Sequence, residues 1–539
     1  MNDDLNTTGG AAVRHVHKNP EVPQTRPAAV DRIKSIDELA EICEAEKSAG
    51  RTVVLAHGAF DLLHLGHVRH LEAARKLGDV LIVTVTADAF IKKGPDRPVF
   101  PEMLRAEMVA ALECVDWSGI HRDASAEDML RRVRPSVYVK GSDYANASED
   151  VTGKIIAERE AVESYGGRIA FTDDVVFSSS KLINDHVLTR DPGAQDIIRT
   201  MKAPDRRARV FDLIENIADT KALFVGETIL DEYVYVQQLG RTAKGNHVST
   251  RYLETEIFAG GVIAAANQAA GLVGEVTVLT CLGNDGMEQL VRSALHPKVR
   301  LEVVQLDDKP TINKRRYLTK PNSPREHLHK LFEVTNLDQE PIAETYHEQI
   351  RNEIKRLTPE HDVMVVCDFG HGMIDSDTVN VIQNAPLFVA VNAQANSANH
   401  GFNLITKYDK SDLMCIDEPE ARLCARDATS PIDFVIRDIL MRQVEAERII
   451  VTQGSKGSIC VDRQGEVTEV PGFAYDPVDT IGAGDAFLAV AAPLLSAGGN
   501  NEDVCFIANV VGGMKVNVVG HRSGLDKGAL LKSIKSLLT

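Results

Sequence analysis

Two short motifs near opposite ends of the chain constrain its fold most strongly. The first, GAFDLLHLGH, occupies residues 58–67, and the second, DTIGAGD, occupies residues 479–485. Each places glycines at a turn that opens a helix, and the first directly follows a strand-like run. A turn of this kind directs several backbone N–H groups at one anion, such as a phosphate. The chain is therefore expected to contain two α/β units, each with a phosphate site.

Length and charge limit the remaining possibilities. A chain of 539 residues exceeds one ordinary hydrophobic core, and 44% apolar with 26% charged residues is typical of a globular protein. The net charge of −18 argues against nucleic-acid binding and against docking on an anionic membrane. The longest apolar run, residues 486–495, is too short to span a bilayer and predicts a buried helix. The eight scattered cysteines include no CxxC pair, which is typical of reduced cytoplasmic proteins.

Composition divides the chain into four parts. Residues 1–34 are polar and lack the apolar core of a signal peptide, so we expect a disordered tail. Residues 35–190 and 221–539 each alternate strand-like and helix-like segments. Residues 191–220 between them are charged and contain a helical run, which predicts a linker helix.

The alternation predicts the elements of both units. A helix is expected from Ser35, which can cap it, and another over residues 103–112. Short β-branched runs predict buried strands at residues 52–56, 80–85, 136–139, 168–171, 222–226, 276–280, 363–367, 387–391 and 448–452. Strands and helices in alternation favour two doubly wound α/β domains with mainly parallel sheets.

The first motif has the composition of a nucleotide site. Gly58 permits a sharp turn after the strand, and Gly66 lets the backbone approach a phosphate closely. His64 and His67 are three residues apart at a helix start, so both can face the same ligand. Imidazole and amide donors there would stabilise negative charge on an α-phosphate under attack. We therefore interpret His64 and His67 as catalytic.

The motif resembles the cytidylyltransferase-like family of nucleotidyltransferases. The resemblance continues through KKGPDRP at residues 92–98, VKGSDY at 139–144 and FSSSKLI at 177–183. It implies a nucleotide site made by Gly58, Phe60, Asp61, Gly66, Lys92, Lys140, Gly141, Asp143, Ser178, Ser179 and Ser180. Asp61 is interpreted as orienting the loop. The alternative role of the serines is a plain helix cap. The alternative for Lys92 is a lysine that contacts only solvent.

Within that family, the strings AARKLGD, DRPV, ALECVDW and KGSDY are most similar to the adenylyltransferase half of bifunctional heptose kinase/adenylyltransferases. The same histidine motif occurs in cytidylyltransferases for glycerol phosphate and ethanolamine phosphate. The nucleotidyl donor, ATP or CTP, stays open.

The second motif has the composition of a phosphoryl-transfer site. Gly482 and Gly484 allow successive amides to converge on one anion at a helix start. Asp485 follows directly and is placed to take a proton from an attacking hydroxyl. No GxxxxGK[ST] loop is present, which excludes a Walker-type kinase.

This motif resembles the ribokinase-like (PfkB) carbohydrate kinases over the second unit. The resemblance implies Asp485 as the base and Asp231, Gly260, Gly261 and Asn267 as sugar ligands. It implies nucleotide contacts from Thr452, Gly454, Gly457, Gly482, Ala483 and Gly484. It also implies Mg²⁺ held near Asp417 and Glu420, with ATP as the phosphoryl donor.

Three positions depart from the kinase pattern. Ala264 stands where the family has Asn, the segment VNAQAN at residues 391–396 replaces a DPKG-like segment, and DEPE at 417–420 replaces Asn-x-x-Glu. These changes leave the identity of the sugar open, whereas Asp485 and both glycines favour an active kinase.

Together the resemblances predict a sugar-activating enzyme for surface polysaccharide synthesis. It would phosphorylate a heptose-like sugar or sugar phosphate, join a sugar 1-phosphate to a nucleotide and release pyrophosphate. In the related bifunctional enzymes the kinase half comes first, whereas here it comes second. One alternative is a polyol-phosphate or amino-alcohol-phosphate cytidylyltransferase fused to a kinase of other specificity. Another is fusion to a pseudokinase that serves as a sensor or dimerisation module. Small-molecule sugar phosphates are the expected partners, and a homodimer is the expected assembly.

Overall fold

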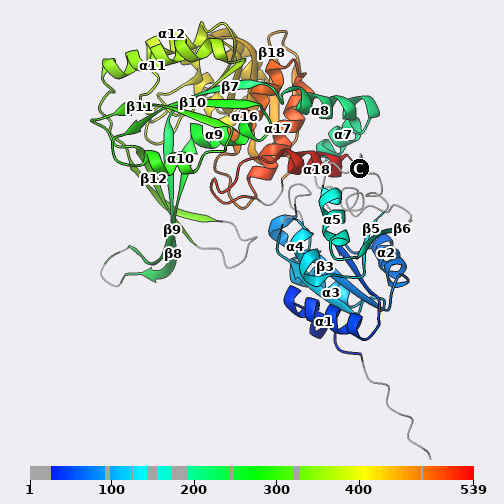
Figure 1. The fold of residues 1–539 in the computed structure, drawn as a ribbon. Helices are drawn as coiled ribbons and strands as arrows, with labels where there is room; N and C mark the ends of the chain where they lie inside the picture. The colour runs from blue at the N-terminus through cyan, green and yellow to red at the C-terminus, as the bar shows by residue number, and fades with distance from the viewer. Residues whose placement is uncertain are drawn as a thin grey trace, which may run out of the picture.

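The structure is a computed structural model with two α/β units (Figure 1). It describes residues 26–91, 98–123, 125–141, 154–172, 192–242, 245, 247–319, 328–474 and 477–538. Residues 1–25 of the predicted disordered tail lie outside the described residues, whereas Ile33–Lys34, predicted to belong to that tail, form a strand of the first sheet.

The first unit contains a six-stranded parallel sheet with strand order β1-β4-β3-β2-β5-β6. Its strands are β1 (Ile33–Lys34), β2 (Val53–Gly58), β3 (Val80–Thr86), β4 (Trp117–His121), β5 (Val137–Gly141) and β6 (Arg168–Thr172). Its helices are α1 (Ile36–Ser48), α2 (Leu65–Arg75), α3 (Glu102–Ala110), α4 (Glu127–Val133) and α5 (Lys154–Glu163). Separate apolar cores pack against the two faces of the sheet.

The strand order places the first motif at a functional position. β3 lies on one side of β2 and β5 on the other, so the order in which strands are added to the sheet reverses at β2, although all the strands run parallel. Crevices at the carboxyl ends of strands beside such a switch point bind ligands in doubly wound folds. The GAFDLLHLGH loop leaves β2 at that end.

The second unit is built on a nine-stranded sheet with order β11-β10-β7-β14-β15-β16-β17-β18-β19. The strands are β7 (Lys221–Gly226), β10 (Glu275–Gly283), β11 (Val299–Leu306), β14 (Val363–Asp368), β15 (Phe388–Ala393), β16 (Lys410–Asp417), β17 (Glu445–Thr452), β18 (Ser458–Asp462) and β19 (Val467–Val470). Neighbours pair in parallel from β11 to β17, and the last two strands are antiparallel.

Helices cover both faces of this sheet (Figure 1). One core contains side chains of α9 (Val262–Ala270), α16 (Ala483–Ser496), α17 (Asn501–Lys515) and α18 (Lys527–Leu537). The other contains side chains of α11 (Glu344–Leu357), α12 (Ser376–Gln383) and α13 (Glu418–Ala425). The two sheets are mainly parallel and covered on both faces, which confirms the predicted fold class. The apolar run at residues 486–495 is part of the buried helix α16, as predicted.

A separate four-stranded sheet, which we call the lid sheet, was not predicted. Its strands, in spatial order, are β13 (His329–Asn336), β12 (Ile312–Thr319), β8 (Thr228–Arg241) and β9 (Val248–Gly261). In Figure 1 the lid sheet extends away from the nine-stranded sheet. Asp231, Gly260 and Gly261 lie at the end of the lid sheet where β8 begins and β9 ends.

The segment expected to be a linker helix forms two helices instead. These are α7 (Pro192–Met201) and α8 (Pro204–Asn216). Met201, Val210, Ile214 and Ile217 are buried in the same core as α16 and α17. Since these apolar side chains need a partner surface, the segment belongs structurally to the second unit.

No helix among the described residues is both long and apolar enough to cross a membrane.

Candidate active sites

His64 and His67 lie side by side at the start of α2. His64 is the N-cap, and its Nδ1 accepts a hydrogen bond from the backbone N–H of Gly66 at 3.0 Å. A neutral imidazole that accepts at Nδ1 carries its proton on Nε2, so Nε2 of His64 is a hydrogen-bond donor. The ring of His67 stacks on that of His64 with the centroids 4.0 Å apart. The structure therefore brings the two predicted catalytic imidazoles together.

The turn before α2 is shaped by Gly58 and Phe60. Phe60 has φ of 45°, and its ring would lie 3.2 Å from a Cβ atom on Gly58. The same ring lies edge-on to His67 with the centroids 5.2 Å apart. Glycine at position 58 therefore leaves room for the aromatic ring that supports His67.

Two buried charged residues hold this loop. Asp61 is 1% exposed and accepts a hydrogen bond from the backbone N–H of Val99. Arg105 is fully buried and donates to the carbonyl of Ala59 and to the carboxylate of Asp88, the latter at 2.6 Å. These contacts fit the interpretation of Asp61 as a loop-orienting residue. Arg105 was missed because a single arginine in an amphipathic helix carries no motif.

The other predicted nucleotide residues divide into two groups. Lys140 and Gly141 end β5, next to β2, and Nζ of Lys140 pairs with Glu158 at 2.9 Å. Burial and then the Lys140 charge lower the pKa of His57 well below its ordinary value, so His57 is neutral. The remaining predicted residues lie outside the described part of the chain: Lys92, Asp143, Ser178, Ser179 and Ser180.

In the second unit, a cavity of about 760 Å³ contains most of the predicted kinase site. This volume suits a ligand of nucleotide or sugar size. The predicted residues that line it are Asp231, Gly261, Asp417, Glu420, Thr452, Gly454, Gly457, Gly482, Ala483, Gly484 and Asp485. Gly260 lies behind Asp231, since a Cβ atom there would come within 2.2 Å of Asp231 Oδ2.

Asp485 occupies the first turn of α16, directly after the glycine turn. Gly482 caps α16 with φ of 76°, a conformation that favours glycine. Burial raises the pKa of Asp485 to about 6, although the nearby charge of His521 opposes that shift. A carboxylate with this pKa accepts a proton more readily than an ordinary aspartate.

A buried network ties the glycine turn to the end of the chain. Asp479 accepts hydrogen bonds from the Tyr233 hydroxyl at 2.9 Å and from the Gly520 N–H at 2.8 Å. Nζ of Lys515 donates to the carbonyls of Ile481 at 3.0 Å and Gly520 at 2.7 Å. These contacts fix the backbone of the glycine turn.

Asp231 is held by two side chains that the sequence did not indicate. Arg316 forms an ion pair with its Oδ1, and Nε2 of His521 lies 3.1 Å from its Oδ2. Burial alone would raise the pKa of Asp231, but the His521 hydrogen bond and the Arg316 charge outweigh it and lower that pKa. Lys314, two residues before Arg316 on β12, is also buried and lines the cavity. Burial and the Arg316 charge lower the pKa of Lys314.

The turn after β17 forms another part of the cavity wall. Gly454 and Gly457 have φ of 58° and 98°, and a Cβ atom on Gly457 would lie 2.1 Å from the carbonyl oxygen of Val470. The backbone N–H of Gln453 closes the turn on the carbonyl of Gly457 at 2.7 Å. Only glycine fits position 457, which keeps Thr452 and Gly454 at the cavity.

Asp417 and Glu420 cap α13 and differ in their fit to a metal. Oδ1 of Asp417 accepts from the N–H of Glu420 at 2.8 Å, while the two Glu420 oxygens accept from the N–H groups of Asp417 and Ala395, each at 3.0 Å. Burial and then the Asp417 charge raise the pKa of Glu420 to about 8. Both Glu420 oxygens are thus engaged, so Asp417 is the better ligand for a hydrated Mg²⁺. Among the described residues, no group of three or more His, Cys, Asp or Glu could hold a metal by itself.

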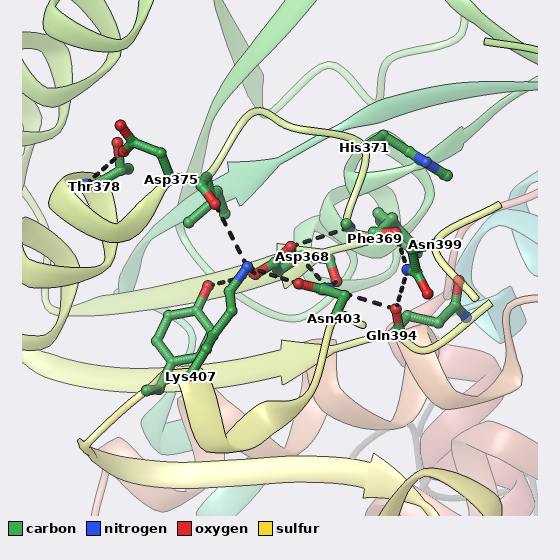
Figure 2. Close-up of polar contacts among 12 residues, drawn as sticks. Asp368, Phe369, His371, Asp375, Thr378, Gln394, Asn399, Asn403 and Lys407 are labelled. Atoms are coloured by element: carbon green, nitrogen blue, oxygen red, sulfur yellow. Dashed lines mark hydrogen bonds and ion pairs between the residues drawn. The ribbon is translucent and has the colours of Figure 1, made fainter. Parts of the chain in front are cut away.

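The unusual segment at residues 391–396 leads into an ordered loop (Figure 2). Nδ2 of Asn403 donates to the carbonyl and side chain of Asp368, and Lys407 pairs with the same carboxylate. Nδ2 of Asn399 donates to the carbonyl of Phe369 at 3.2 Å. Because Phe369 lines the cavity together with Asn392 and Gln394, this loop shapes its wall.

Asn267 does not belong to the site, contrary to the prediction. Its Nδ2 donates to the carbonyl of Ala294 at 2.8 Å, and its Oδ1 accepts from the N–H of His296 at 2.8 Å. Asn267 is not among the cavity-lining residues, and Ala264 is buried one turn earlier in α9. The asparagine stabilises a loop of the fold instead.

Sequence comparisons agree with this geometry. The sequence model of the pfkB family carbohydrate kinases matches residues 219–528, more than half of the chain. The chain belongs to the pfkB family of carbohydrate kinases. A cytidylyltransferase-like model matches residues 55–185, the part that contains the two stacked histidines. The chain thus joins a nucleotidyltransferase-type domain to a carbohydrate kinase domain, in that order.

Curated relatives match the N-terminal region. The Bifunctional protein HldE of Trichlorobacter lovleyi is 38% identical over 195 residues, which are 34% of this chain and 38% of the relative. The protein of the same name from Syntrophotalea carbinolica is 40% identical over 161 residues, 30% of this chain and 31% of the relative. The chain therefore spans about a third of the length of the curated relatives it matches.

Solved structures with similar folds include phosphofructokinase-2 from Escherichia coli in complex with substrates and products and Arabidopsis thaliana ribokinase complexed with ribose and ATP. The first is 16% identical, has a TM-score of 0.47 and covers 59% of this chain and 99% of its own. The second is 19% identical, has a TM-score of 0.45 and covers the same shares.

Proposed function

We propose that the chain is a bifunctional sugar-activating enzyme with both active sites intact. The kinase domain, residues 221–539 together with α7 and α8 that pack on its core, would transfer the γ-phosphoryl group of ATP to a heptose-like sugar or sugar phosphate. The nucleotidyltransferase domain, residues 35–190, would join a sugar 1-phosphate to a nucleotide and release pyrophosphate. The observation that carries the proposal is that Asp485, with its raised pKa, shares a cavity with the glycine turn.

In the kinase step, Asp485 takes the proton of the attacking hydroxyl. The hydroxyl oxygen bonds to the γ-phosphorus while the bond from that phosphorus to the bridging oxygen of ADP breaks. The amides that follow Gly482 at the start of α16 stabilise the charge on the moving phosphoryl group. Asp417 would hold Mg²⁺ through water, and the ion would neutralise charge on the phosphates.

In the nucleotidyl step, a phosphate oxygen of the sugar 1-phosphate attacks the α-phosphorus, and pyrophosphate leaves. His64 and His67 donate hydrogen bonds to the α-phosphate, where negative charge builds during the attack. The N-terminus of α2 adds backbone amides and a positive dipole end at the same place.

The finer assignment, to ADP-heptose-type synthesis in the cytoplasm for a surface polysaccharide, is supported by the relatives named Bifunctional protein HldE. Since the matching model is named for cytidylyltransferases, a cytidylyltransferase for a polyol or amino-alcohol phosphate is the second candidate. In that case the kinase domain would have a different specificity or would serve as a sensor.

One screen of the full chain distinguishes these candidates. ATP and CTP are each incubated with Mg²⁺ and a panel of heptose, hexose, glycerol and ethanolamine phosphates, and pyrophosphate release is measured. We expect release with a heptose 1-phosphate, whereas release only with CTP and an alcohol phosphate would favour the second candidate. ADP release with heptoses, hexoses and their phosphates tests the kinase in parallel. If no sugar stimulates ADP release, the kinase assignment is wrong.

We also propose a homodimer that forms through the lid sheet. Its strands expose large apolar side chains at Leu239, Val248, Tyr252, Ile257, Phe332 and Val334, each more than 40% accessible. Apolar side chains gathered in this way mark interaction surfaces. Light scattering should give twice the chain mass of 58.9 kDa. Phe332→Glu should give the monomer mass, and a monomeric wild type would contradict the proposal.

A further inference from the structure

His521 combines three features in the kinase cavity that none of the sequence motifs indicates. Its side chain is only 6% exposed, and it lines the same cavity as Asp485 and the glycine turn. Its Nε2 lies 3.1 Å from Oδ2 of Asp231, a residue 290 positions away in the sequence. Asp231 accepts there, so Nε2 carries a proton and the ring is held in one orientation.

The opposite edge of the ring faces the anion-binding turn. A Cβ atom built on Gly482 would lie 2.8 Å from Cε1 and 3.6 Å from Nδ1 of His521. The imidazole thus occupies the space in which position 482 would carry a side chain. This places Nδ1 beside the turn that opens α16.

Nδ1 is buried and has no hydrogen-bond partner among the described residues. A buried polar atom without a partner is unfavourable, and a ligand atom at that place would supply the missing hydrogen bond. The charged groups around the ring and the turn are of both signs: Arg316, Lys314 and Lys515 with Asp231, Asp479, Asp485 and Glu333. The backbone N–H groups that open α16 beside Nδ1 favour an anionic oxygen at this place.

We propose that His521 is a further catalytic residue of the kinase domain. When the anionic phosphoryl group binds, the ring takes a second proton from solvent at Nδ1 while Nε2–H stays on Asp231. In the transition state Nδ1–H then donates a hydrogen bond to an oxygen of the phosphoryl group that passes the glycine turn. During the transfer itself no bond to His521 forms or breaks, since the hydroxyl proton goes to Asp485. This inference rests on the proposed kinase function.

Two amide variants test the two nitrogen atoms of the His521 ring separately. In His521→Gln the amide nitrogen reaches the position of Nε2, so the contact with Asp231 is kept and the Nδ1 donor is lost. In His521→Asn the amide nitrogen takes the position of Nδ1, so the donor is kept and the contact with Asp231 is lost. The acceptor is the best sugar found in the screen above. Kinase kcat and KM, pyrophosphate release and thermal unfolding are measured for each full-length variant.

We expect His521→Gln to lower kinase kcat about 10²-fold with KM within about threefold, since one transition-state donor is removed. His521→Asn should retain about tenfold more kcat than the Gln variant, and pyrophosphate release should be unchanged in both. A Gln variant with wild-type kcat, or one changed only in KM, would overturn the inference alone. A wild type that phosphorylates no sugar would overturn the proposed function and the inference together.

Discussion

The two active sites are assembled in opposite ways. In the first unit, Phe60, His64 and His67 come from one loop and one helix start, and they contact one another directly. In the second unit, Asp485 meets Asp231 from the lid sheet and His521 from beyond α17. The first site is therefore local in sequence, whereas the second depends on how distant elements pack.

This difference explains where each site tolerates change. The side chains of the local site contact one another within one loop, which Asp61 and Arg105 hold in place, so its motif has to stay complete. A site built from distant elements can keep its reaction centre while its substrate wall is replaced. The kinase cavity follows this pattern, since Asp485 and the glycines remain while residues 391–396 form a different loop.

The largest effect should come from Asp485→Asn in the kinase site. The amide cannot take the hydroxyl proton, so kinase kcat should fall about 10³-fold. Pyrophosphate release should not change, because Asp485 lies in the other unit. Steady-state assays of ADP and pyrophosphate on the same preparation measure both effects. Equal ATP turnover in wild type and variant would show that the domain is a sensor rather than a kinase.

The reciprocal test removes the histidines of the local site. His64→Ala or His67→Ala should lower pyrophosphate release about 10²-fold, since each removes one donor to the α-phosphate. ADP release by the kinase domain should stay at the wild-type level, and thermal unfolding of each variant checks that the first unit is folded. If both variants release pyrophosphate at the normal rate, the assignment of the first site is wrong.

Features that depend on local sequence could be predicted, whereas those that depend on contacts between distant segments could not. Runs of β-branched residues predicted β2, β3, β5 and β6 within a few residues, because their side chains are buried on a regular sheet. The helical spacing of apolar residues predicted α1 in the same way. The motifs predicted the positions of the stacked histidines and of the glycine turn before Asp485.

Prediction failed where the signal is not local. The lid-sheet strand β9 is largely exposed and rich in polar residues, so it lacks the pattern of a buried strand. Arg316 and His521 belong to no motif, and only the folded chain brings both of them to Asp231. Asn267 was wrongly assigned because a short distance in sequence from Gly261 was taken for proximity to the sugar.

A smaller effect should appear in the pH dependence of the kinase reaction. Asp485 acts as a base only when deprotonated, and burial raises its pKa to about 6. Kinase kcat should therefore be constant above that pH and fall tenfold per unit below it. With an ordinary aspartate as the base, this fall in kcat would begin only at about pH 3.9. A kcat profile from pH 4.5 to 8 measures the limb, and full activity at pH 5 would contradict the assigned base.

A substitution in α8 should have the smallest effect on activity but a clear effect on stability. Ile214 is fully buried in the core that contains α16 and α17. Ile214→Ala should lower the free energy of unfolding of the kinase domain by about 3 kcal/mol, through lost burial and a cavity. Asp212→Ala, at an exposed position of the same helix, is the matched control and should change it by less than about 0.5 kcal/mol. Urea unfolding followed by kinase activity measures both. If the two variants unfold alike, residues 191–220 act as a linker after all, and the kinase domain begins only at β7.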